Sequence, residues 1–220
     1  MGGVAVFMKK IFDDPVLNSI TEIELAPIVT HGNINEALMS SIISQQISTA
    51  AARSIKRKFT EYFGGLDVAT TSESNLPSRY PTTDEVLNIE IEKLRGLGLS
   101  SQKATYIKSV AEFYKNNNLF GIEKSNSNKL LELSDEELIK ELTKIKGVGR
   151  WTVEMILIFT LGRPDVFAID DLALRQAVIK LYKLKNTKTL KKRILKISER
   201  WSPNRSLASR YLWAWRDGNK

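Results

Sequence analysis

Hydrophobic and polar positions recur with a helical period along almost the whole chain. The first long pattern starts at Asn35, the expected N-cap. Its apolar positions fall on one helical stripe: Ala37, Leu38, Ile42, Ile43 and Ile47. A second stripe runs from Ala50 to Phe63 and stops at Gly64 and Gly65. These patterns predict two consecutive amphipathic helices.

Capping signals mark further helix starts. A proline follows two acids in Asp13-Asp14-Pro15, acids fill the first turn of Thr83-Asp-Glu-Val, and Ser134-Asp-Glu-Glu137 matches a capping box. A turn at Gly96-Leu-Gly98 leads into a helix over 101–115, and the Ser-, Thr- and Pro-rich residues 69–81 indicate a surface loop. Strand-like alternation is nowhere sustained, so the sequence predicts an all-α fold.

Two glycines separate two apolar helical patterns in Gly147-Val-Gly149. Such a pair allows a sharp turn, and the N–H groups of the first turn of the next helix can then face a phosphate. The alternative is that the segment is only a tight turn between two helices. Farther along, Asp170 and Asp171 open a third helical pattern, where they either cap the helix or point an acid into a cleft.

These segments together resemble the helix-hairpin-helix DNA glycosylases, and within them the 3-methyladenine DNA glycosylase II group. The resemblance covers roughly residues 34–216 and is carried by these motifs: Ile42-Ile-Ser-Gln-Gln-Ile-Ser48, Gly147-Val-Gly-Arg-Trp-Thr152, Pro164-Asp-Val-Phe167, Asp170-Asp-Leu-Ala-Leu174, Trp201-Ser-Pro-Asn-Arg-Ser206 and Tyr211-Leu-Trp213. It implies two helical subdomains with a cleft between them, residues 34–124 and residues 1–33 plus 125–220. The second would carry the helix-hairpin-helix, at about 138–160, and the catalytic acid. Without the resemblance, a single irregular helical domain is the alternative.

Composition agrees with a DNA-binding globular protein without proving it. A chain of 220 residues with 42% hydrophobic residues can bury a sizeable core. The net charge of +8 and the pI near 9.5 favour a polyanionic partner, although many basic proteins bind no nucleic acid. The resemblance implies that this partner is double-stranded DNA containing damaged bases. The absence of cysteine excludes a disulfide framework, a thiolate nucleophile and an iron–sulfur cluster of the endonuclease III type.

No anchor or metal-binding side chain is expected. The apolar run from Gly2 to Met8 is too short to span a bilayer and lacks the features of a signal peptide. His31 is the only histidine and has no ligand partners at metal spacing. We therefore expect an intracellular monomer with no membrane partner, located in the cytoplasm or nucleoid of a prokaryote or the nucleus of a eukaryote. No required cofactor is expected.

The resemblance implies that Asp171 is the catalytic acid, with Asp170 as helix cap or orienting neighbour. A carboxylate beneath C1′ would stabilise the oxocarbenium-like sugar formed when an N-glycosidic bond breaks. Bifunctional relatives place a lysine nucleophile where this chain has Trp151. The guanidinium of Arg150 stays protonated and cannot replace that amine. The sequence therefore predicts a monofunctional glycosylase that leaves an abasic site.

The resemblance also implies a base pocket formed by Trp151, Trp213, Met155, Leu172 and Gln45. Indole rings attract cationic alkylated purines such as 3-methyladenine and 7-methylguanine. Met155 and Leu172 stand where some members have tyrosine, so the resemblance implies a less aromatic pocket with a narrower range of substrates. Without a family, the C-terminal tryptophans would more often be core anchors, and Gln45 could equally be a buried brace between helices.

The DNA-contacting residues are expected at the hairpin and at two neighbouring loops. Gly147, Gly149 and Thr152 would offer backbone or hydroxyl donors to phosphates, and relatives often hold a monovalent cation on hairpin carbonyls. Relatives fill the gap left by a flipped base from the loop that corresponds to Leu99-Ser-Ser-Gln102, and some have a leucine at the place of Ser101. Ser101 would contact DNA but fills less volume, so Leu99 or a residue of Ser44-Gln-Gln46, such as Gln46, is expected to fill the gap. Competing functions are a glycosylase for deaminated or mismatched bases and a non-catalytic helix-hairpin-helix DNA-binding protein.

Overall fold

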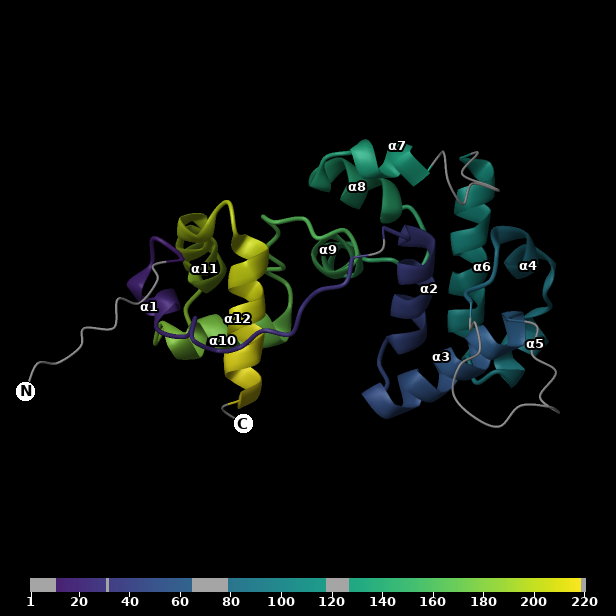
Figure 1. Ribbon diagram of the computed structural model, residues 1–220, viewed down its shortest axis with the longest axis horizontal. Helices are drawn as coiled ribbons and strands as arrows, with labels where there is room; N and C mark the ends of the chain where they lie inside the picture. The colour runs from purple at the N-terminus through teal and green to yellow at the C-terminus, as the bar shows by residue number, and fades with distance from the viewer. Residues whose placement is uncertain (1–10, 31, 65–78, 118–126, 219–220) are drawn as a thin grey trace, which may run out of the picture. The chain divides into compact units, whose positions relative to one another are not determined.

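The computed structural model describes residues 11–30, 32–64, 79–117 and 127–218. Regular structure in these residues is helical throughout, which confirms the all-α fold (Figure 1). The helices are α1 (Pro15–Asn18), α2 (Ile34–Ser44), α3 (Thr49–Phe63), α4 (Thr83–Asn88), α5 (Ile91–Gly96), α6 (Ser101–Asn116), α7 (Ser127–Glu132), α8 (Asp135–Leu142), α9 (Arg150–Phe159), α10 (Leu172–Leu181), α11 (Leu190–Ser198), the 3₁₀ turn η1 (Glu199–Trp201) and α12 (Arg205–Gly218). Predictions for residues 2–8, His31 and the loop at 69–78 lie outside the described residues. Of the helices described, none is long and apolar enough to cross a membrane.

The chain divides into two compact units, one of residues 1–30 with 157–220 and the other of residues 31–156. This division differs from the predicted one, because the hairpin groups with the residues that precede it. Two contacts give the physical reason. Gln45 Nε2 donates a hydrogen bond to the Gly147 carbonyl oxygen at 3.0 Å, and Gly147 lies directly against the ring of Tyr106 in α6. The hairpin turn is thus built onto α2 and α6.

In the unit of residues 31–156, α6 packs against α2, α4 and α5, and α2 also packs against α3. Its largest fully buried side chains are Leu38, Met39, Ile42, Ile43, Phe59, Leu94, Ile107, Leu138 and Leu142. The prediction that Asn35 caps the first long helix is wrong. Asn33 Oδ1 accepts the Glu36 N–H at 3.2 Å, because Ile34 is already a buried helical residue. The predicted capping box at Ser134 and Glu137 is confirmed.

In the other unit, α12 packs on α10, and α10 also contacts α11 (Figure 1). Trp201 is its central core residue, 1% exposed, with its ring against those of Phe167 and Tyr182. The wholly buried Asp14 caps α1 and accepts hydrogen bonds from Tyr182 Oη at 2.8 Å and Trp201 Nε1 at 3.2 Å. Arg200 completes the cluster at 3.2 Å. Asp14 therefore holds the N-terminal residues onto the C-terminal helices.

Two motifs that lie far apart in the sequence form one brace in this unit. Asp165 accepts hydrogen bonds from Arg205 Nε at 2.7 Å and Nη2 at 2.9 Å. Ser206 Oγ donates to the Arg163 carbonyl at 2.6 Å and accepts the Val166 N–H at 3.0 Å. These bonds fix the loop after α9 to the start of α12.

Candidate active site and nucleic-acid interface

Asp171 is the N-cap of α10. Its Oδ1 accepts the backbone N–H of Leu174 at 2.6 Å and the indole Nε1–H of Trp213, from α12, at 3.1 Å. The carboxylate is half-buried, and it sits at the positive end of a helix dipole. It is therefore an oriented anion on a rigid element.

The expectation that Asp170 could be the helix cap is wrong. Asp170 is exposed, and its Oδ1 forms an ion pair with Lys191 Nζ of α11 at 2.7 Å. Asp171 itself caps α10, because its side chain and not that of Asp170 folds back onto the Leu174 N–H. Capping and the predicted reactive role therefore fall on the same side chain.

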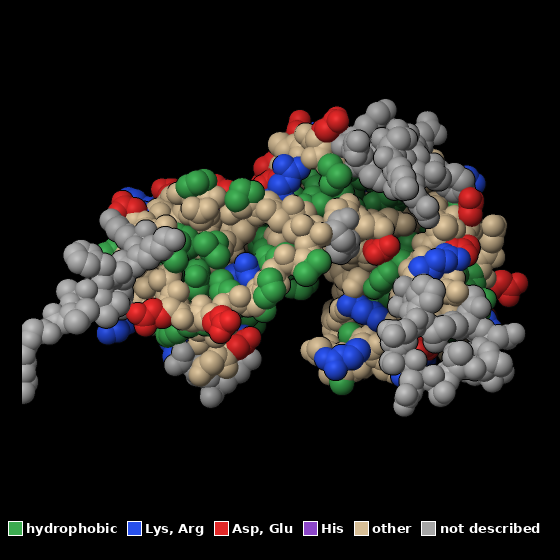
Figure 2. Space-filling view, in the orientation of Figure 1, with side chains coloured by type: hydrophobic (Ala, Val, Ile, Leu, Met, Phe, Trp, Pro, Cys, Tyr) green, Lys and Arg blue, Asp and Glu red, His purple; other side chains and the backbone are tan. Residues whose placement is uncertain are grey.

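Aromatic and aliphatic side chains accompany this carboxylate. The ring of Trp213 lies 5.7 Å from that of Phe159, measured between centroids, and the planes are 33° apart. Phe159 is 41% exposed and Leu172, next to Asp171, is 61% exposed. Figure 2 shows hydrophobic side chains reaching the surface of the body that holds α10–α12. Trp213 is only partly buried, in contrast to the core residue Trp201.

Phe159 was missed from the sequence, although a signal for it exists. Trp151, Met155 and Phe159 follow one another at intervals of four along α9, which places them along one face of that helix. Trp151 is 42% exposed and Met155 is partly exposed, whereas Val153 and Leu157 on other faces are fully buried. An aromatic stripe that stays exposed on an otherwise buried helix is typical of a ligand-facing surface.

The two hairpin glycines have different roles. Gly147 has a φ of +90°, and a Cβ on it would lie 2.2 Å from Cδ2 of Tyr106. Gly149 immediately precedes α9, is exposed, and a Cβ there would meet open space. The first N–H groups of α9 have no intrahelical acceptor, so this end of the helix is where the hairpin can meet an anion.

Two basic side chains at the hairpin, Lys144 and Arg150, form ion pairs with acids of the same unit. Lys144 pairs with Glu141 at 2.6 Å, and Arg150 pairs with Glu154 at 2.9 Å and also with Glu136. Arg150 also lowers the pKa of Glu136 below its ordinary value, chiefly through their hydrogen bond. Arg150 is therefore anchored within the hairpin.

The other residues predicted to contact DNA differ in their exposure to solvent. Ser101 is exposed as the first residue of α6, and Gln46 is exposed with a φ of 54°. Leu99 is only 4% exposed, so it cannot fill a gap in DNA from this conformation. Thr152 is also 4% exposed, which leaves its backbone N–H and not its hydroxyl for a phosphate.

Gln45 and Ile47 both follow the C-terminal end of α2. The amide of Gln45 bonds to the hairpin carbonyl described above, as expected of a brace. Ile47 does not continue the stripe of α2, because that helix ends at Ser44 and the left-handed turn at Gln46 redirects the chain. Ile47 is 37% exposed as a result.

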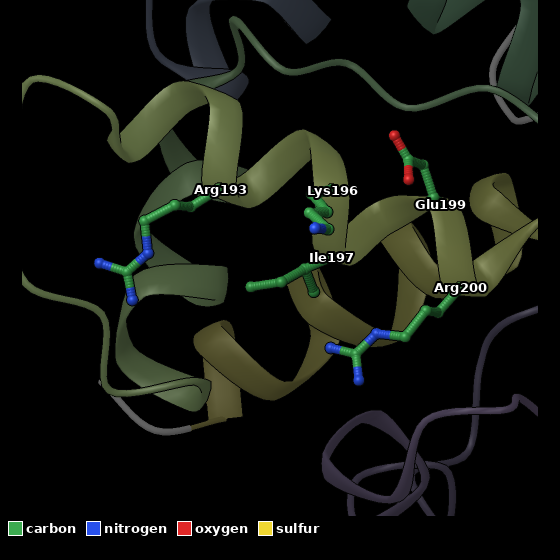
Figure 3. Close-up of a pocket in the computed structure, with 5 residues that line it drawn as sticks. All are labelled: Arg193, Lys196, Ile197, Glu199 and Arg200. Atoms are coloured by element: carbon green, nitrogen blue, oxygen red, sulfur yellow. The ribbon is translucent and has the colours of Figure 1, made fainter.

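A separate open pocket lies on α11 and η1. Its lining is formed by Arg193, Lys196, Ile197, Glu199 and Arg200 (Figure 3). Arg200 there already pairs with the buried Asp14. Neither Asp171 nor Trp213 lines this pocket, so it is distinct from the candidate active site.

Comparison with known proteins defines the class. Residues 39–203 match the model of the HhH-GPD superfamily of base excision DNA repair proteins, and the chain belongs to this superfamily. It is 38% identical to DNA-3-methyladenine glycosylase 1 of Schizosaccharomyces pombe over 178 residues, 81% of this chain and 70% of that protein.

Two solved structures agree with this assignment. The 3-methyladenine DNA glycosylase of Schizosaccharomyces pombe in complex with abasic DNA has a TM-score of 0.68 at 34% identity, over 90% of this chain and 87% of the other. The DNA-3-methyladenine glycosidase of Bacillus halodurans has a TM-score of 0.74 at 29% identity, over 92% and 85%.

Proposed function

We propose that this protein is a monofunctional DNA glycosylase that excises alkylated bases, of the 3-methyladenine and 7-methylguanine type, from duplex DNA and so initiates base excision repair. The observation that carries the proposal is the carboxylate of Asp171, fixed by two donors at the start of α10. The chain's superfamily and the names of its relatives support the reaction and the substrate class.

Asp171 supplies what the bond cleavage needs. As the N-glycosidic bond of a flipped nucleotide lengthens, positive charge develops on the sugar, and a nearby carboxylate stabilises it. The bonding electrons leave with the base and neutralise its cationic ring. Water then adds to C1′ and releases a proton to the solvent, which leaves a hydroxyl group on the sugar. A cationic base is a good leaving group, so one acid suffices. An abasic site remains in the DNA.

The lesion is selected by exposed apolar side chains. Trp151, Trp213, Met155 and Leu172 are each at least partly exposed, as side chains that contact a flipped base must be. An indole face attracts a cationic ring more strongly than a neutral one, by about 0.5–2 kcal/mol per contact. Gln45 contributes indirectly, by holding the hairpin turn.

The hairpin grips the DNA backbone without reading sequence. Gly149 leaves room for a phosphate beside the first N–H groups of α9. The exposed Gln46 is the candidate for filling the gap behind a flipped base, and the exposed Ser101 is a candidate DNA contact. A monovalent cation on hairpin carbonyls is part of the proposal. The carbonyl oxygens of Gly147 and Ile145 already accept hydrogen bonds, from Gln45 Nε2 and the Val148 N–H respectively. A cation bound to either oxygen would share it with that hydrogen bond. The protein acts as a monomer on double-stranded DNA.

The decisive experiment measures base release from duplexes that each contain one defined lesion. Wild-type protein should release 3-methyladenine and 7-methylguanine, and Asp171→Asn should lower the single-turnover rate by about 10²–10³-fold or more. Binding to lesion DNA should stay equal or become tighter, because an anion leaves the binding surface. Asp170→Asn is the matched control and should keep near-normal turnover. Release of hypoxanthine or uracil alone would favour the deaminated-base alternative, and no release from any duplex would favour a binding protein.

The products test the monofunctional reaction separately. Because Trp151 occupies the position of an amine nucleophile, borohydride should trap no covalent adduct, and strands should break only after alkali or heat. A stable trapped adduct would show that a lysine of this chain attacks C1′.

A further inference from the structure

We infer that Trp213 is a positioning residue for Asp171, acting through its indole N–H, in addition to any contact its ring face makes with a base. This inference rests on the proposed function of Asp171. The indole Nε1–H and the Leu174 N–H, from two different helices, both point at Oδ1 of the same carboxylate, at 3.1 Å and 2.6 Å.

The two donors constrain the carboxylate more than a cap alone would. A single bond to the Leu174 N–H leaves the carboxylate able to rotate about that oxygen. A second donor from α12 restricts this rotation, because α12 packs along α10. The half-buried carboxylate is then held in one orientation before substrate arrives, which lowers the reorganisation needed in the transition state.

The indole is itself held in place. Phe159 stacks obliquely on its ring at 5.7 Å, and the bonds from Arg205 and Ser206 to the loop at 163–166 fix the N-terminal end of α12. Trp215, two residues later on the same helix, faces a different group, because the ammonium of Lys180 lies 5.5 Å from its ring centroid. The N–H of Trp213 is thus a donor on a rigid support.

Kinetics of Trp213→Phe test this role, because phenylalanine keeps an aromatic ring and removes the N–H. The single-turnover rate of 7-methylguanine release should fall about tenfold or more, as expected for one hydrogen bond to a charged group. The dissociation constant for an abasic duplex and the melting temperature should change little. Trp215→Phe, the same exchange on the same helix, should leave the rate unchanged. A fall in affinity with an unchanged rate, or an equal loss in both variants, would overturn the inference.

A spectroscopic measurement tests the contact without relying on activity. In ¹H–¹⁵N spectra of the full chain, the indole signal missing in Trp213→Phe identifies Trp213. That signal should move upfield in Asp171→Asn, which keeps a good N-cap but weakens the acceptor. The signals of Trp201 and Trp215 should stay in place. An unmoved Trp213 signal would overturn the contact itself. A moved signal in a protein that releases no base would instead refute the proposed function, and with it the positioning role.

Discussion

Two aspartates of the same unit, Asp14 and Asp171, have similar hydrogen-bond partners but differ in exposure to solvent. Asp14 and Asp171 each cap a helix, and each accepts an indole N–H, from Trp201 at 3.2 Å and from Trp213 at 3.1 Å. Asp14 is 0% exposed and also bonds to Arg200 and Tyr182, whereas Asp171 is half-buried beside the exposed Leu172. Cap geometry therefore does not distinguish the structural carboxylate of Asp14 from the proposed catalytic carboxylate of Asp171. Their exposure to solvent does.

Of the substitutions considered, replacement of the buried aspartate, Asp14, should have the largest effect on stability. Asp14→Asn keeps the cap but weakens the buried acceptor of Tyr182 and Trp201 and removes the charge that faces the half-exposed Arg200, so the free energy of unfolding should fall by about 2–3 kcal/mol. Asp171→Asn should change it by less than about 0.5 kcal/mol, since asparagine caps as well as aspartate. Urea unfolding of both variants measures this difference. Similar losses in the two variants would mean that burial does not distinguish these aspartates.

The same contrast shows what could be predicted from sequence. The motif around Asp171 indicated the acid that we propose as catalytic, and the local capping signals predicted many of the helix starts, because both depend on residues close in sequence. The role of Asp14 was not predictable, since its partners Tyr182, Arg200 and Trp201 lie at the far end of the chain. The local sequence pattern likewise did not predict that Leu99 and Thr152 are buried, because tertiary packing determines their exposure.

The sequence motifs also contain residues whose structural roles the motifs themselves did not reveal. Asp165 and Arg205 belong to two motifs quoted separately, and only the structure pairs them. Gln45 was left open between the base pocket and a brace, and its bond to Gly147 depends on a contact across 102 residues. Non-local contacts of this kind carry no periodic signal along the chain.

The two hairpin glycines extend the comparison to the other unit. Gly147→Ala should lower the free energy of unfolding by about 1–3 kcal/mol, because it needs a left-handed alanine and displaces the Tyr106 ring. Gly149→Ala meets open space and should change it by less than about 0.5 kcal/mol. Thermal melts of the two variants measure this.

For DNA affinity, measured per folded molecule, we expect the opposite order: Gly149→Ala should lose more affinity than Gly147→Ala. Gly149→Ala narrows the approach to the first turn of α9, so affinity for damaged and undamaged duplexes should fall together. Gly149→Asp, which adds a negative charge, should weaken both further. A loss confined to damaged DNA would place Gly149 in the base pocket and not on the phosphate path.

A smaller loss of stability than at Asp14 or Gly147 is expected at the brace between the loop after α9 and the start of α12. Arg205, followed by Ser202 and the Arg205 N–H, lowers the pKa of Asp165 below its ordinary value. A depressed folded-state pKa stabilises the protein above the unfolded pKa of about 3.9, and the contribution is lost as the pH falls through the folded value. At pH 7, Asp165→Asn should cost about 1 kcal/mol, since both partners are partly exposed to solvent. Urea unfolding of wild type and variant at pH 7 and at descending pH below 4 should show this difference shrinking toward zero. A difference that stays constant with pH would show that the pair acts through packing and not through charge.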